Sequence, residues 1–232
     1  MLAERWQVCG IDLPGHGQSG GRRGHIDAFS EYVEAIEASL GEIGSSSRPI
    51  LLAQSMGALV ALQVALKNQA ELSGLILLSP FLRLRLPVPA WKVWLANHLS
   101  KSWPTFSLPT ELSGSDMTRD PIAAASYDRD PLNNKKATAR WFTETRSAQA
   151  QVFARANELR LPCLILHGNA DPVADPRASE AFFAQIASVD KTLRMLPDMR
   201  HELLHELEPD RTRTLNDIVG WLDRHRPASP PS

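Results

Sequence analysis

The 232-residue chain is 43% hydrophobic and 22% charged, which is typical of one globular α/β domain with a large core. Its formal net charge of −1 gives no electrostatic reason to expect nucleic acid or an acidic membrane surface as a partner. No apolar run approaches the roughly 20 residues that cross a bilayer, and no Cys/His cluster has metal-ligand spacing.

The first elements of the chain alternate between strand and helix patterns. Residues 6–12 favour a strand that contains Cys9, and a glycine-rich loop follows at residues 13–21. From residue 28 to residue 43, apolar residues recur at helical spacing. Cys9 and Cys163 both fall within predicted strands, so we expect two buried free thiols rather than a disulfide.

The loop at residues 15–20 matches the dinucleotide-binding fingerprint G-x-G-x-x-G. A true fingerprint opens directly into a helix, whereas here residues 21–24 continue the loop and the helix begins only near Ala28. We therefore predict no nicotinamide or flavin cofactor, and we interpret the glycines as residues of a tight loop.

A short apolar run that ends at a serine is the most informative stretch of the chain. Residues 50–54 favour a buried strand, and an apolar helix pattern begins at Ser55. Small residues, Ala53 and Gly57, stand two positions before and after the serine, which is typical of a nucleophile elbow. The alternative is a serine that caps a helix after a buried strand, as in many α/β proteins.

An acid and a histidine follow this serine in the order that a nucleophile-elbow hydrolase requires. Residues 74–80 and 161–167 favour buried strands, and Asp171 lies in the turn after the second of them. His201 follows a further strand at residues 191–197. Because the carboxyl ends of parallel strands meet at one edge, we expect all three side chains there. His201 would take the proton of the serine, and Asp171 would orient the imidazole.

Other residues could fill these roles. Asp175 and Asp198 are the alternative acids, and we expect both to lie on a loop surface or to cap a helix. His167 precedes a glycine at a strand end and is expected to support the loop that carries Asp171. His205 lies one turn beyond His201 and is expected to be solvated.

About 80 residues interrupt the alternation of strands and helices, and we interpret them as a helical lid. We therefore divide the chain into a core at residues 1–80 and 161–226, a lid at residues 81–160 and a disordered tail at residues 227–232. The lid holds four of the six tryptophans. An amphipathic helix is predicted at residues 89–99, and a further helix at residues 142–159. The core closes with a helix at residues 211–224.

The tryptophans of the lid allow two interpretations. Trp91, Trp94, Leu95 and His98 share one side of the first lid helix and suit a hydrophobic acyl chain or transient contact with a lipid surface. The alternative, which we favour for each tryptophan taken singly, is that these aromatics hold the lid to the body.

The chain resembles the α/β-hydrolase superfamily and, within it, the group of monoacylglycerol lipases and lysophospholipases of serine aminopeptidase S33 type. The motifs that carry the resemblance are D-L-P-G-H-G-Q-S at 12–19, Q-S-M-G at 54–57, H-G-N-A-D at 167–171, R-H-E at 200–202, T-R-D-P at 118–121 and Y-D-R-D-P-L at 127–132. This resemblance implies a mostly parallel sheet flanked by helices. It also implies hydrolysis of single-chain lipid esters through an acyl-enzyme on Ser55, without a cofactor.

The resemblance also implies residues around the nucleophile. The Met56 amide would hold the oxyanion, and we expect Gln54, Trp91 and Trp94 to contact the substrate. Ala53 and Gln54 depart from the usual glycine and the frequent histidine of the group, and neither change removes a catalytic group.

One part of the family pattern is absent from the sequence. A second oxyanion donor usually follows an apolar strand that lies between the strand at residues 6–12 and the elbow strand, and nothing of this kind precedes Trp6. Residues 1–5 resemble the end of the first helix, so we expect an N-terminally truncated sequence. The alternative function is a catalytically impaired remnant or ligand-binding protein. The expected location is the cytoplasm, with peripheral contact to a membrane.

Overall fold

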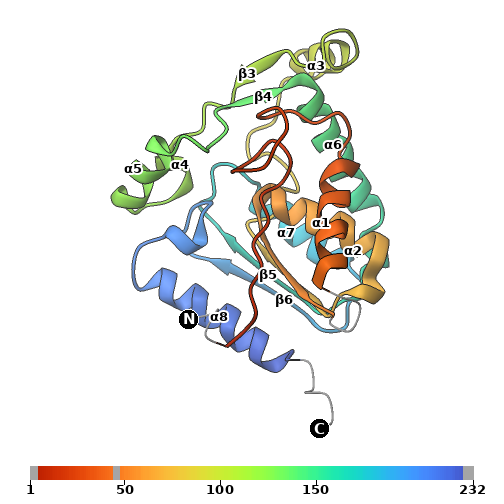
Figure 1. The fold of residues 1–232 in the computed structure, drawn as a ribbon. Coiled ribbons are helices and arrows are strands. Elements are labelled where there is room, and N and C mark those ends of the chain that lie inside the picture. The colour runs from red at the N-terminus through yellow and green to blue at the C-terminus, as the bar shows by residue number, and fades with distance from the viewer. Residues whose placement is uncertain (1–4, 44–47, 227–232) are drawn as a thin grey trace.

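Four parallel strands form the central sheet, in the order β1-β2-β5-β6 (Figure 1). The computed structural model describes residues 5–43 and 48–226. The strands are β1 (Ile50–Gln54), β2 (Gly74–Leu78), β5 (Cys163–Gly168) and β6 (Lys191–Leu196). The predicted strands at these four places are confirmed, and each is parallel to its neighbours. The burial predicted for residues 50–54 is wrong, because β1 is an edge strand of the described sheet and Leu52 is 39% exposed.

Different helices cover the two faces of the sheet. Successive side chains of a strand point to opposite faces, so neighbouring residues of one strand pack against different helices. On one face, Leu75 and Leu77 of β2 belong to a core shared with four helices; on the other, Ile76 and Leu78 pack with a single helix, α8. The four helices are α1 (Ser30–Ile43), α2 (Ser55–Asn68), α6 (Ala139–Ala154) and α7 (Pro176–Gln185), and α8 spans Asp210–Arg224. The helices predicted near residues 28–43, 179–187 and 211–224 are therefore confirmed.

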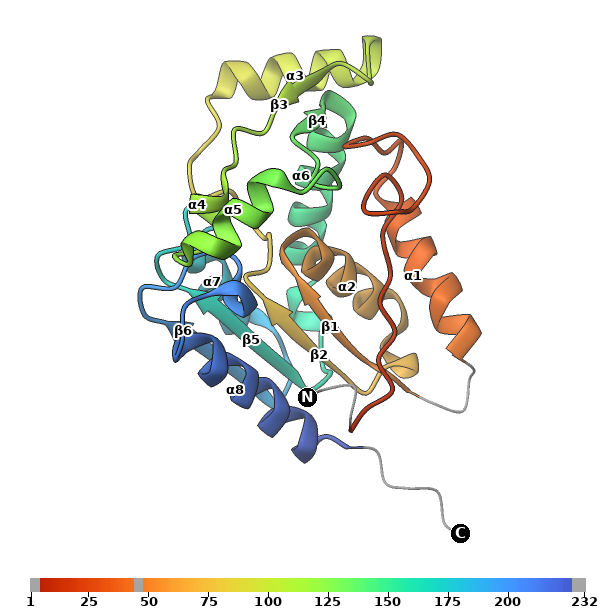
Figure 2. The ribbon, with the colours of Figure 1, turned by 60° about the vertical axis from the view of Figure 1, so that its left-hand side comes forward.

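The segment between β2 and β5 lies for the most part beyond the carboxyl ends of the strands, as both ribbon views show (Figures 1 and 2), and its last helix, α6, returns to the core on one face of the sheet. It contains α3 (Ala90–Ser102), β3 (Ser107–Pro109), α4 (Gly114–Met117), α5 (Pro121–Arg129), β4 (Lys136–Thr138) and α6. Strands β3 and β4 form an antiparallel pair that the sequence did not predict, because three residues are too few for a periodic pattern. Short 3₁₀ turns follow α2, α6 and β6 at Gln69–Glu71, Ala156–Glu158 and Leu203–His205.

The predicted strand at residues 6–12 is wrong. The segment is extended but pairs with no described strand, and Val8 and Ile11 are 61% and 40% exposed. Its composition favours a strand, yet a strand is stable only beside a partner. For the same reason Cys9 is exposed rather than buried, whereas Cys163 is buried in β5 and burial raises its pKa to about 12. Neither cysteine forms a disulfide.

Two further predictions concern residues outside the described ones. The predicted end of a first helix falls largely on residues 1–4, and the predicted disordered tail is residues 227–232. The structure describes neither segment.

The interpretation that the lid tryptophans hold the lid to the body is wrong for three of the four. Trp91, Trp94 and Trp103 are between 58% and 67% exposed. Only Trp141, on α6, is half-buried against the main core. The side of α3 that carries Trp91 and Trp94 faces solvent, whereas Ser100, which is buried, meets α6 through a hydrogen bond between its Oγ and Thr143 Oγ1 (2.7 Å).

The carboxyl end of β5 lies very close to the backbone of residues 199–200, directly before His201. A Cβ placed on Gly168 would lie 2.2 Å from the carbonyl oxygen of Met199 and 2.5 Å from that of Arg200. Both neighbours are backbone atoms, so they cannot turn aside as a side chain would. Only glycine therefore allows β5 to approach the segment that carries His201.

We expect Gly168→Ala to lower the free energy of unfolding by about 1–3 kcal/mol, the usual cost of overpacking a tight site. The measurement is urea unfolding. Gly41→Ala is the matched control, because Gly41 lies in α1 with no atom within 4 Å of an added Cβ. A loss no greater in Gly168→Ala than in Gly41→Ala would contradict the close approach.

Candidate active site

Ser55 stands at a sharp turn between β1 and α2. Strand β1 ends at Gln54, helix α2 begins at Ser55, and Ser55 has a φ of 51°. This left-handed conformation is costly for a residue with a side chain. A Cβ added to Gly57 would lie 3.9 Å from the Cβ of Ala53, so the flanking positions face each other across the turn. This contact explains the small residues and shows that alanine fits at position 53.

The structure brings Ser55, His201 and Asp171 into one hydrogen-bonded line. His201 Nε2 lies 2.8 Å from Ser55 Oγ, and His201 Nδ1 lies 2.7 Å from Asp171 Oδ2. Asp171 follows β5 and His201 follows β6, so each residue comes from the carboxyl end of a different strand. Asp171 and His201 are 1% and 4% exposed, which removes most water from their hydrogen bond.

The hydrogen-bond partners determine the tautomer of His201. An ionised carboxylate only accepts hydrogen bonds, so His201 Nδ1–H must donate to Asp171. In the neutral imidazole, Nε2 then carries a lone pair that faces Ser55 Oγ. This is the arrangement in which the serine hydroxyl can donate its proton to Nε2.

The Asp171 carboxylate is held by four N–H groups. Its Oδ1 accepts from the backbone amides of Val173 (2.8 Å) and Ala174 (3.0 Å). Its Oδ2 accepts from His201 and, at 3.1 Å, from His167 Nε2–H. Burial alone would raise the pKa of Asp171, but the hydrogen bonds and charges of His167 and His201 outweigh burial and hold that pKa well below its usual range. The carboxylate therefore stays ionised.

His167 supports the loop that carries Asp171, as the sequence predicted. Because its Nε2–H donates to Asp171, its Nδ1 accepts a hydrogen bond from Ser179 Oγ of α7 at 2.7 Å. The side chains of His167 and Asp171 have no exposed surface. Ser179 was missed by the sequence analysis, since nothing in the chain marks a helix serine as the partner of a histidine twelve residues earlier.

The loop that carries His201 is anchored by a buried carboxylate that the sequence did not reveal. Glu206 accepts from the backbone amide of Arg200 (2.7 Å) and from Arg119 Nε (2.8 Å), and its side chain has no exposed surface. Arg119 also donates to Asp210 Oδ2 at 2.6 Å. Arg119 belongs to the T-R-D-P motif, which was the only sequence signal for this connection between the segment that follows β2 and the loop of His201.

The alternative residues lie elsewhere. Asp175 caps α7 by accepting from the Arg177 amide, as predicted. Asp198 has a φ of 60° in the loop after β6, and its amide donates to Asn169 Oδ1. The side chain of His205 is 63% exposed, and its Nδ1 lies 3.0 Å from Glu202 Oε2. The hydrogen bond to Glu202 raises the pKa of His205. Within the described ranges, no three His, Cys, Asp or Glu residues gather as metal ligands.

The structure places the remaining predicted site residues in two locations. Gln54 is the last residue of β1, and Met56 lies in the first turn of α2; both are half-buried beside Ser55. Trp91 and Trp94 lie on α3, in the segment beyond the strand ends, with most of each indole exposed. Their contact with substrate stays a prediction.

The chain matches one family model over most of its length. The model of a family described as "Serine aminopeptidase, S33" matches residues 1–208. Among proteins, the chain is 30% identical to a monoacylglycerol lipase of Mycolicibacterium smegmatis, over 97% of this chain and 82% of that protein. It is 28% identical to the phospholipase YtpA of Bacillus subtilis, over 97% of this chain and 89% of that protein.

Solved structures give the same result. The monoacylglycerol lipase of Paleococcus ferrophilus superposes with a TM-score of 0.86 at 28% identity, over 92% of this chain and 82% of that chain. A soluble variant of the monoglyceride lipase of Saccharomyces cerevisiae, in complex with a substrate analogue, has a TM-score of 0.79 at 25% identity. That match covers 92% of this chain and 76% of the other.

We expect His167→Leu to slow the reaction of Ser55 with a fluorophosphonate by roughly ten- to hundredfold, because a hydrogen bond to a charged group is lost. His167→Gln keeps a donor and should recover most of the rate. The measurement is the second-order labelling rate at neutral pH, with circular dichroism to confirm folding. Equal rates in the leucine variant and the unchanged chain would contradict a positioning role.

Proposed function

The chain belongs to the serine aminopeptidase S33 family and is an ester hydrolase with the α/β-hydrolase fold, and on this basis we propose that it cleaves monoacylglycerols, lysophospholipids or similar single-chain lipid esters through an acyl-enzyme on Ser55. The observation that carries the proposal is the hydrogen-bonded line from Ser55 through His201 to the buried Asp171. In water a serine hydroxyl is a poor nucleophile; here a base lies within reach of its proton.

We propose the following course for the reaction. Ser55 Oγ attacks the ester carbonyl carbon while His201 Nε2 takes the hydroxyl proton, and the carbonyl oxygen becomes an oxyanion near the Met56 amide. The tetrahedral intermediate collapses, the C–O bond to the alcohol breaks, and His201 Nε2–H protonates the leaving alkoxide. Water then attacks the acyl carbon while His201 Nε2 takes one of its protons. As the second tetrahedral intermediate collapses, the C–O bond to Ser55 breaks, His201 returns the proton to Ser55 Oγ, and the fatty acid is released.

Asp171 acts through His201 in this scheme. Its carboxylate fixes the Nδ1–H tautomer and stabilises the imidazolium that forms in each half of the reaction. Because His167 and two backbone amides hold the carboxylate as well, it cannot turn away when His201 becomes charged. The arrangement is thus ready before the substrate arrives.

The exposed apolar side chains of α3 support a lipid substrate presented at a surface. Trp91 and Trp94 are mostly exposed, and Leu95 next to them is 39% exposed. Amphipathic aromatic side chains of this kind favour the boundary between water and lipid. Within residues 5–43 and 48–226, no helix combines the length and hydropathy needed to cross a bilayer. We therefore propose peripheral contact through α3.

We expect a fluorophosphonate probe to label the purified chain at Ser55 and Ser55→Ala to abolish labelling. His201→Ala should slow labelling by at least about 10³-fold, because the proton acceptor is lost. The measurement is intact-protein mass spectrometry with peptide mapping. Ser79→Ala is the matched control, since Ser79, like Ser55, follows a strand and has a positive φ, yet its hydroxyl has no hydrogen-bond partner among the described residues.

A folded chain that stays unlabelled would contradict the enzymatic proposal. That outcome would favour the alternative, a ligand-binding protein that keeps the three residues but lacks an effective oxyanion site.

We expect long-chain monoacylglycerols to be hydrolysed faster than acetyl esters, and Trp91→Ser/Trp94→Ser to lower turnover on dispersed lipid by about tenfold. The same double variant should cleave a water-soluble butyrate ester at an unchanged rate, because the role proposed for α3 is contact with dispersed lipid or a long acyl chain, and a short soluble ester offers neither. The measurement is fatty-acid release with both substrates.

Val189→Ser is the control for this experiment. Val189 is a fully exposed apolar residue just before β6, at the amino-terminal end of the strand. Its replacement removes an exposed apolar side chain and leaves α3 unchanged. A chain-length profile that favours acetyl esters, or equal loss on both substrates, would contradict the role of α3.

A further inference from the structure

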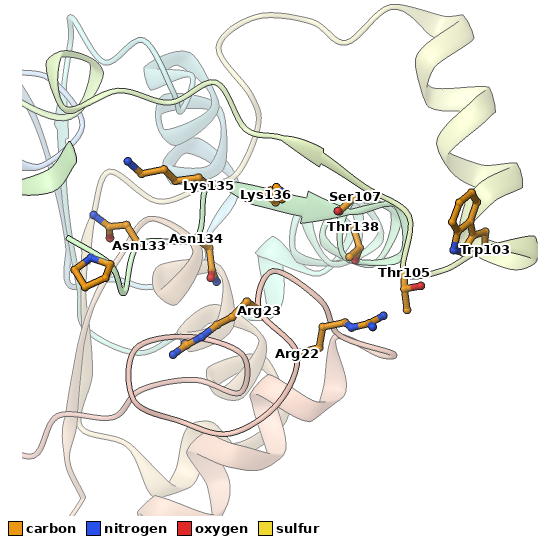
Figure 3. A pocket seen from close by; sticks show the side chains of 11 residues that line it. Arg22, Arg23, Trp103, Thr105, Ser107, Asn133, Asn134, Lys135, Lys136 and Thr138 are labelled. Atoms are coloured by element: carbon orange, nitrogen blue, oxygen red, sulfur yellow. The ribbon is translucent and has the colours of Figure 1, made fainter. Parts of the chain in front are cut away.

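A cavity lies apart from the Ser55 site, between the loop before α1 and the β3–β4 pair (Figure 3). Its volume is about 600 Å³. Figure 3 shows Arg22 and Arg23 on one side, Lys135 and Lys136 on the other, and Trp103 at one end. Residues far apart in the sequence therefore meet here, and no residue of the Ser55 site lines the cavity.

The lining of this cavity is strongly positive. It contains four cationic side chains and no acidic one. Arg23 donates to the Gly17 carbonyl and Lys135 Nζ to the Asp128 carbonyl, and neither neutral acceptor supplies a countercharge. Arg22 and Lys136 have neither a side-chain hydrogen bond nor an ion pair with any residue in the described part of the chain. Arg23 and Lys135 likewise form no ion pair with a residue in the described part of the chain.

Neutral donors accompany these cations. Thr105 and Ser107 line the same cavity, and their hydroxyls have no hydrogen-bond partner among residues 5–43 and 48–226. Hydroxyl and guanidinium groups together are the usual ligands of phosphate oxygens. Each of the unengaged side chains could donate to a bound anion without breaking an existing contact.

The walls of the cavity are fixed to each other before any ligand binds. The Thr138 amide of β4 donates to the Gly24 carbonyl at 2.9 Å, and Asn134 Nδ2 donates to the Gly15 carbonyl at 2.9 Å. A Cβ on Gly24 would lie 2.1 Å from the Lys136 carbonyl oxygen, which shows how closely the loop approaches the strand. A preformed site loses less entropy on binding than a mobile one.

We propose that this cavity binds a phosphate group. A phosphate group offers several acceptor oxygens and carries one or two negative charges. It therefore matches two unpaired cations and free hydroxyls better than a single carboxylate does. Two sources share this chemistry: the head group of an anionic lipid and a small soluble phosphate ester. The exposed Trp103 at the rim favours the lipid, because tryptophan side chains suit the head-group region of a membrane.

Phosphate binding at this cavity is separate from ester hydrolysis, so it is measured without turnover. In a Ser55→Ala background, two ligands are compared: glycerol 3-phosphate by titration calorimetry, and phosphatidylcholine vesicles with or without phosphatidylglycerol by co-sedimentation. Arg22→Gln/Lys136→Gln should weaken phosphate-dependent binding by about tenfold or more. The binding should also weaken as salt is raised, since the charges are exposed.

Arg160→Gln/Arg224→Gln is the matched control, because it removes the same charge from two exposed arginines away from the cavity. Selective loss by the cavity variant supports the site. Loss on anionic vesicles alone identifies a lipid head group, and loss on glycerol 3-phosphate alone identifies a soluble phosphate ester. Equal binding by the two variants, or no binding of either ligand by the chain with an intact cavity, overturns the proposal.

Discussion

The buried carboxylate of Asp171 is the interaction on which the rest of the site depends. An ionised carboxylate is costly to bury unless its oxygens are fully hydrogen-bonded, and here four N–H groups surround it. These donors come from the Asp171 loop itself, from β5 through His167 and from the loop after β6 through His201. The same contacts that stabilise the charge therefore hold three chain segments in register, and Ser179 connects α7 to this group.

Hydrogen bonds to Glu206 hold the loop that carries His201. Glu206 accepts hydrogen bonds from the Arg200 amide and from Arg119, which comes from the segment beyond the strand ends. The Glu202 amide also donates to the Met117 carbonyl at 2.7 Å. The base of that segment and the loop of His201 are therefore one hydrogen-bonded unit. By contrast, the tryptophans of α3 extend away from it, so the aromatic surface is exposed while the residues near Ser55 are held.

The sequence predicted those parts of the structure that depend on local pattern. Buried strands, amphipathic helices and the order Ser55, Asp171, His201 are visible because strand periodicity and turn composition are local properties. The predicted strand at residues 6–12 failed because a strand also needs a neighbour, which composition cannot supply. Glu206 and Ser179 were not found, since their roles arise from contacts between segments. The tryptophans of α3 were misjudged because an apolar side is buried only where something covers it.

The net charge of the chain was the least informative sequence property, because it does not show which charges the fold brings together. A formal charge of −1 over 232 residues suggests no anionic partner, yet four cationic side chains meet in one cavity without a carboxylate among them. Charges at a protein surface act over about a Debye length, roughly 8–10 Å in physiological salt, so the field at this cavity depends on its own lining and not on the total. Arg22–Arg23 and Lys135–Lys136 are unremarkable pairs more than a hundred residues apart in the sequence. Only the packing of the loop before α1 against β4 makes them a single positive surface.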